Sequence, residues 1–61
     1  MTYTVEQKRK AIERELRYRR RVYTRQVEAG KMLQSFMDEQ IAVFEAIRED
    51  YAKAEASERL I

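Results

Sequence analysis

The sequence contains no cysteine, no histidine, no proline, no tryptophan and only one glycine. The absence of cysteine excludes disulfides, and the absence of both cysteine and histidine removes the usual ligands of a structural zinc site. Catalysis by a thiol nucleophile or an imidazole base is excluded for the same reason, and a single glycine cannot form a glycine-rich phosphate loop. We therefore expect no enzymatic activity, no catalytic residues, no metal site and no cofactor.

Long apolar runs are also missing. No stretch approaches the roughly 20 apolar residues that a membrane-spanning helix needs. The first residues, MTYTVEQKRK, lack the apolar segment of a signal peptide. We therefore expect a soluble, cytoplasmic protein with no membrane partner.

The chain is 61 residues long, which allows one domain at most. A domain of this size buries only about 60% of the surface of its unfolded chain, so its core is marginal. Small domains are reinforced by disulfides, metals or oligomerisation. Because the first two are excluded here, we expect a homo-oligomer, with a dimer favoured.

The residues that are present favour helices. Charged residues make up 39% of the chain, and Ala, Glu, Arg, Lys, Gln, Leu and Met are frequent. Thr4 and Gln7 have the spacing of a capping box, and Gly30 suits the left-handed position after a helix end. We expect a single all-α domain over residues 1–61, with one helix over about 5–29, a turn over about 30–33 and a second helix over about 34–58.

Helical spacing assigns faces to the first helix. Its main apolar seam consists of residues four or seven apart: Val5, Ile12, Leu16, Tyr23 and Val27. Arg19 and Arg20 occupy the gap in this seam, where their aliphatic stems can cover apolar groups while the guanidinium groups reach water. A thinner apolar line, Ala11, Tyr18, Val22 and Ala29, lies roughly a quarter-turn away, and one partner helix cannot easily cover both.

The second helix carries a broader pattern. Leu33, Met37, Gln40, Phe44, Ile47, Tyr51 and Ala54 alternate by four and three, as in a coiled-coil seam, and Phe36, Ile41 and Val43 widen the stripe. We predict an antiparallel helical hairpin that dimerises into a four-helix bundle. The expected hairpin and oligomer interface comprises Ile12, Leu16, Tyr23, Val27, Phe36, Met37, Gln40, Val43, Phe44, Ile47 and Tyr51.

Gln40 is the polar member of this pattern. One buried polar residue in a seam often fixes the register of the helices at a cost in stability. Alternatively, Gln40 lies at the edge of the seam and meets water.

Charge is divided between the helices. Residues 5–29 hold nine basic and four acidic side chains, whereas residues 31–61 hold four and seven. This asymmetry favours neighbouring helices of opposite sign. On the first helix a "basic ridge" forms from residues three or four apart: Lys10, Arg14, Arg17, Arg21 and Arg25. It could be a solvated or inter-helix face, follow a nucleic-acid backbone over about 22 Å, or contact an acidic protein.

Two stretches, EL-RYRRRVY-TRQVEAGKM and DEQIAVFEAIREDY, resemble a group of short phage and prophage proteins. In that group an RRRVY segment, a V-x-x-G-K/R-M turn and an E-I-A-x-M-E-A-I helix occur in this order. The likeness covers about residues 15–51; Phe44 stands where the group has Met, and the entry into the second helix lacks the group's Ala-Asp pair. The resemblance implies an accessory protein acting in the bacterial host cytoplasm.

Two functions follow as hypotheses. In the first, an oligomeric interaction module binds a host or phage protein and inhibits or modulates a host factor. In the second, the basic ridge binds nucleic acid without sequence specificity. Neither hypothesis involves catalysis.

Overall fold

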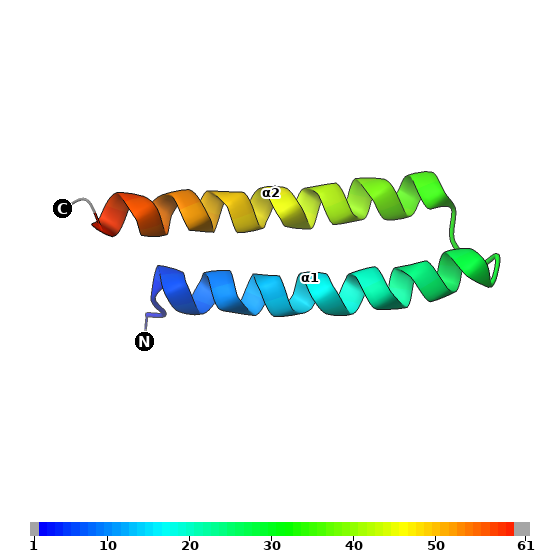
Figure 1. The fold of residues 1–61 in the computed structure, drawn as a ribbon, viewed down its shortest axis with the longest axis horizontal. Helices are drawn as coiled ribbons and strands as arrows, with labels where there is room; N and C mark the ends of the chain where they lie inside the picture. The colour runs from blue at the N-terminus through cyan, green and yellow to red at the C-terminus, as the bar shows by residue number, and fades with distance from the viewer. Residues whose placement is uncertain (1, 60–61) are drawn as a thin grey trace.

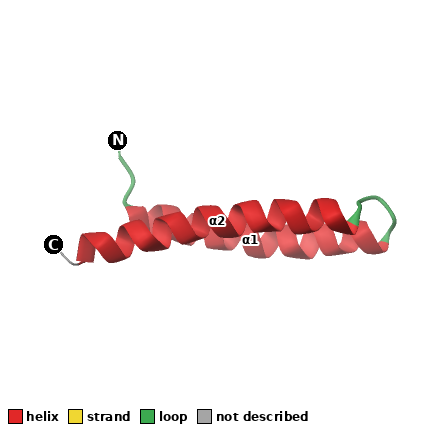
Figure 2. Cartoon of the chain, turned by 90° about the horizontal axis from the view of Figure 1, so that it is seen from above, coloured by secondary structure: helices red, strands yellow, loops and turns green. Residues whose placement is uncertain are grey.

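A computed structural model describes residues 2–59 as two antiparallel helices joined by a short turn (Figure 1). Helix α1 spans Val5–Glu28 and helix α2 spans Gln34–Arg59. The predicted all-α helical hairpin is thereby confirmed, and each helix ends within one residue of its expected C-terminal bound. Seen from above, the helices overlap along their length and cross at a shallow angle (Figure 2). The molecule measures 48 × 20 × 15 Å, so both broad faces of the hairpin are open.

The predicted capping box begins α1. The Thr4 hydroxyl accepts a hydrogen bond of 3.1 Å from the backbone N–H of Gln7. In return, the Gln7 side-chain oxygen accepts one of 2.8 Å from the backbone N–H of Thr4. These bonds satisfy two N–H groups that the first turn of a helix cannot pair internally. The prediction from Thr4 and Gln7 is confirmed.

Gly30 ends α1 with a φ of +74°, the left-handed conformation expected for it. The backbone N–H of Gly30 donates to the carbonyl of Val27 at 3.0 Å, and that of Lys31 donates to the carbonyl of Gln26 at 2.8 Å. This pair of bonds is a Schellman motif, which closes the helix and redirects the chain. The turn then leads to Gln34, where α2 begins.

The core lies in the seam between the helices and is small. Among residues 2–59, the buried apolar side chains are Leu16, which is 2% exposed, and Ile41, at 8%. Within that range, no helix is apolar over a long enough stretch to cross a bilayer. Two buried apolar residues make a thin core for a chain of this length.

The seam on α2 is rotated from the expected one. Ile41 and Glu55 are the buried positions, whereas Leu33 is 74% exposed and Ala54 is also exposed. Leu33 and Ala54, which the spacing places in the expected seam, are therefore not part of the buried seam between the helices. The reason is that α2 carries two overlapping apolar stripes, and the helical period alone averages them into one.

Candidate interaction surfaces

The helices are joined at their open end by a buried ion pair. Glu55 of α2 is 9% exposed, and the Arg9 Nε of α1 donates a hydrogen bond to its carboxylate. Arg9 also donates to Glu13 at 2.8 Å, and Arg59 donates to Glu55 at 2.9 Å. Burying a carboxylate is costly unless it is paired and hydrogen-bonded, and these two guanidinium groups meet that need.

The pair remains charged at neutral pH. The hydrogen bond from Arg9 lowers the pKa of Glu55, and this effect outweighs desolvation, which acts in the opposite direction. The same hydrogen bond raises the pKa of Arg9. Removing the partner of either group would leave a charge in a partly dehydrated position.

We predict that Glu55 makes the hairpin sensitive to acid. A carboxyl whose pKa is lowered by folding contributes stability above its ordinary pKa of 4.5, and this contribution disappears as the pH falls through the lowered value. The free energy of unfolding, measured with urea at several pH values from 7 to 3, should therefore fall less steeply below pH 4.5 in Glu55→Gln than in the wild type. The control Glu58→Gln removes an exposed carboxylate from the same helix. Equal pH profiles for Glu55→Gln and the wild type would contradict the assignment.

Arg19 and Arg20 fill the gap in the α1 seam, as the sequence suggests. The Arg19 guanidinium lies 4.5 Å from the centre of the Phe44 ring and donates to the Tyr23 hydroxyl at 2.7 Å. The hydrogen bond to Tyr23 is the main cause of a raised Arg19 pKa. Arg20 instead reaches Glu45 of α2 at 3.4 Å. Arg20 thus links α1 to α2 through opposite charges, and Arg19 links them by packing its guanidinium group on an aromatic ring.

Three charged residues of the seam were missing from the expected interface. Arg9 fills the slot between Val5 and Ile12, and Glu55 and Arg48 follow Ile41 at seven-residue spacing. Heptad spacing could have located all three, since each falls on a core-facing position. A search for apolar residues alone passes over them.

The rotation of α2 leaves a second apolar stripe away from α1. We call it the second stripe; its members repeat every three, four or seven residues, and they are Phe36, Gln40, Val43, Ile47 and Ala54. Phe36 is 48% exposed and Val43 is 50% exposed. On α1, Tyr18 of the thin apolar line is 54% exposed. At 100° per residue both stripes turn toward the same broad face of the hairpin, and apolar areas of this kind usually mark interfaces.

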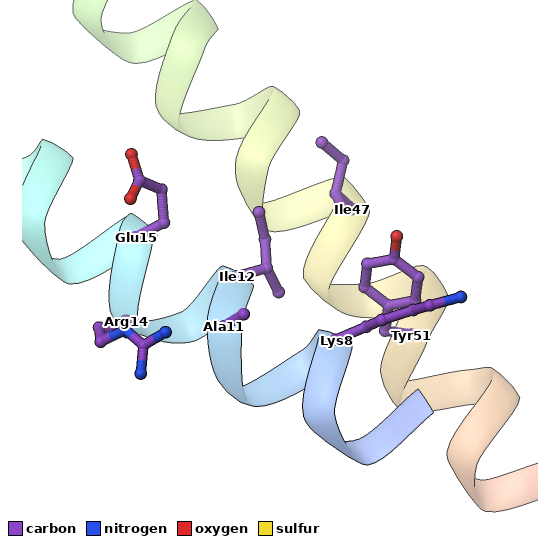
Figure 3. A pocket seen from close by; sticks show the side chains of 7 residues that line it. All are labelled: Lys8, Ala11, Ile12, Arg14, Glu15, Ile47 and Tyr51. Carbon is purple, nitrogen blue, oxygen red and sulfur yellow. The ribbon is translucent and has the colours of Figure 1, made fainter. Parts of the chain in front are cut away.

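A shallow groove runs along this broad face between the helices. Figure 3 shows Ile12 pointing from α1 toward α2, with Ile47 and Tyr51 on the adjoining stretch of α2. The groove has a volume of about 560 Å³ and is also lined by Lys8, Ala11, Arg14 and Glu15. Its centre is apolar and its rim is charged, an arrangement typical of protein interfaces.

The residues of the expected interface differ in exposure. Leu16 is buried, and Phe36 and Val43 are exposed. The others are partly buried: Ile12, Tyr23, Val27, Met37, Gln40, Phe44, Ile47 and Tyr51. Gln40 lies in the second stripe, so its two interpretations, a register-fixing contact with a second copy or a water-facing edge, both stay predictions.

All five residues of the basic ridge are exposed. Lys10 pairs with Glu6 at 2.9 Å, and the Arg21 guanidinium lies 5.9 Å from the centre of the Tyr18 ring. The four arginines of the ridge, Arg14, Arg17, Arg21 and Arg25, form no ion pair within residues 2–59. The ridge therefore presents cations to solvent whose charge is not neutralised by a nearby carboxylate.

Within the part of the chain that the structure describes, no cluster of three or more acidic residues could hold a metal ion. Comparison of the chain with protein-family models, curated proteins and solved structures finds no match. The hairpin therefore offers two surfaces from which to infer a function: an apolar face and a basic one.

Proposed function

We propose that this protein is a non-enzymatic interaction module that works as a dimer. The observation that carries the proposal is the second stripe, whose Phe36 and Val43 stay exposed on a hairpin with few apolar side chains in its own core. Exposed apolar stripes at heptad spacing pack well against another helix and poorly against water. We propose that a second copy of the chain packs against the second stripe.

Charge supports one arrangement of the two copies. Basic α1 of one copy packs antiparallel against acidic α2 of the other, which pairs opposite charges and forms an antiparallel four-helix bundle. In this arrangement the second stripe of one copy, with Phe36 and Val43, covers the thin apolar line of the other, with Tyr18 and Val22. The basic ridge points outward from the bundle on both copies.

The outward ridge is then the surface for a further partner. We propose a host or phage protein with an acidic surface, in keeping with the phage-like sequence of residues 15–51, and inhibition or modulation of a host factor as the outcome. Affinity purification from bacterial lysate, with nuclease treatment to remove nucleic-acid bridges, tests this proposal. Failure to recover a stoichiometric protein would contradict it.

Nucleic-acid binding is the second candidate function. It is favoured by the four arginines of the ridge, which form no ion pair within residues 2–59, because a duplex or single strand offers a regular row of phosphates to such a surface. Binding of this kind requires no base contacts and weakens steeply as salt rises.

We predict that Arg14→Glu combined with Arg21→Glu lowers the affinity for an oligonucleotide by about a hundredfold at roughly 50 mM salt, because two phosphate contacts are lost and two repulsive charges are added. Gel-shift titration measures this affinity. The control Lys31→Glu combined with Lys53→Glu changes the net charge equally but leaves the ridge intact. If the wild type does not bind at this salt concentration, the nucleic-acid proposal is excluded.

A further inference from the structure

We propose that a depression on the basic side of the hairpin is a phosphate-binding site, suited to one backbone phosphate of a nucleic acid. The proposal deepens the second candidate function and rests on it. The depression lies midway along the hairpin, where the central turns of α1 and α2 run side by side (Figure 1). It is lined by Glu13, Leu16, Arg17 and Arg20 of α1 and by Arg48 of α2.

Arg48 is a charged residue in the seam between the helices. It occupies a core-facing position of α2, seven residues after Ile41 and seven before Glu55, and is partly buried. Glu55 is neutralised by Arg9, whereas Arg48 forms no ion pair within residues 2–59. Arginine stays charged at every physiological pH. A hairpin that needed only packing at this position would be served better by an apolar residue.

The carboxylates around the depression are already bound. Glu13 accepts a hydrogen bond from Arg9 at 2.8 Å, and Glu45 pairs with Arg20 at 3.4 Å. The lining therefore contains three guanidinium groups and one engaged carboxylate. Arg17 and Arg48, from opposite helices, are the two lining arginines that form no ion pair within residues 2–59.

The shape and chemistry fit a phosphate group. The depression has a volume of about 240 Å³, which holds a tetrahedral anion with several of its waters, since each water takes about 30 Å³. Guanidinium groups bind phosphate oxygens in a planar, bidentate manner. A carboxylate can be satisfied by a single arginine, whereas a phosphate offers oxygens to donors from both helices. The buried Leu16 forms an apolar wall, which weakens competition from water.

The site also continues the basic ridge. Arg17 belongs to both, so a strand whose phosphates follow the ridge would bring one phosphate to the depression. Arg48 is then the contribution of α2 to a surface that otherwise belongs to α1. Reading the sequence helix by helix does not reveal this, because the site forms only when the hairpin closes.

The test is an NMR titration of the full chain with inorganic phosphate at roughly 50 mM NaCl, observing the arginine Nε–H signals. We expect saturable shifts at Arg17 and Arg48, with Arg25 unchanged. In Arg48→Gln the affinity should fall at least about tenfold, as expected for losing a hydrogen bond between charged groups. Lys53→Gln, which removes one charge from the same helix, should bind as the wild type does. Equal shifts at all arginines, or unchanged binding in Arg48→Gln, would overturn the proposal.

A second arm uses a single-stranded oligothymidylate to separate the two sources of phosphate. Arg48→Gln should lower its affinity about tenfold relative to Lys53→Gln, with circular dichroism confirming that both variants are folded. A loss confined to free phosphate would overturn the nucleic-acid assignment. If the Arg14→Glu, Arg21→Glu variant loses the oligonucleotide while Arg48→Gln retains it, the ridge function stands and the depression is excluded.

Discussion

Leu16→Ala should largely unfold the protein. Leu16 is the most buried apolar residue described, at 2% exposure, and truncating such a leucine costs about 2–5 kcal/mol. A domain of 61 residues has about 3–9 kcal/mol of stability in total, at the usual value per residue. The substitution therefore removes a large share of what keeps the chain folded. Urea unfolding followed by circular dichroism at 222 nm measures the loss.

Leu33→Ala is the matched control for this experiment. It deletes the same atoms from a leucine in the turn that is 74% exposed, so its effect should stay within about 0.5 kcal/mol. Similar losses in Leu16→Ala and Leu33→Ala would contradict the assignment of the core to the seam between α1 and α2.

Val43→Asp should separate the dimer into monomers. Val43 is 50% exposed in the hairpin, so a charge there is tolerated by one copy. In the proposed bundle the same side chain is covered by the second copy, and a carboxylate would be buried without a partner. Because both copies carry the change, we expect a cost of at least about 4 kcal/mol per dimer, which is roughly a thousandfold in Kd.

The neighbouring exposed residue provides the control for Val43→Asp. Ala42→Asp introduces the same charge one position earlier, on the opposite broad face of the hairpin, and should leave the dimer intact. Size-exclusion chromatography with light scattering compares the masses of the two variants. A dimer that survives Val43→Asp, or that is lost equally in Ala42→Asp, would remove the second stripe from the interface.

The ends of the helices could be predicted from the sequence because the interactions that define them are local. Thr4 and Gln7 lie three residues apart, and Gly30 acts through its own φ and the bonds of its immediate neighbours. Such features depend on a few consecutive residues, so short sequence patterns predict them well. The alternation of apolar residues was sufficient in the same way to predict two helices folded into a hairpin.

Local sequence patterns did not predict which face of α2 packs against α1. Two apolar stripes overlap on this helix, and either could face α1. The choice is made by long-range contacts, above all the ion pair of Arg9 with Glu55 and the packing of Arg19 on Phe44. These pairs join residues more than twenty positions apart, and charged residues at core-facing positions contribute nothing to an apolar pattern. The depression with Arg48 was missed for the same reason.

The basic ridge was visible from spacing alone, because residues three or four apart on a helix share a face. Spacing alone did not show which of these charges are paired with carboxylates. Lys10 is paired with Glu6, while Arg14, Arg17, Arg21 and Arg25 have no carboxylate partner in the described chain. Which side chains pair depends on the rotamers that they adopt in the folded hairpin. That pairing determines how many charges of the ridge are available to a partner.

We propose above all that a second copy of the chain covers the apolar face of the hairpin. Sedimentation equilibrium of the wild-type chain tests it most directly, with circular dichroism on the same sample to confirm the helices. We expect a single folded species with twice the 7.4 kDa mass of the chain. A fully helical, stable monomer of 7.4 kDa at micromolar concentration would contradict it.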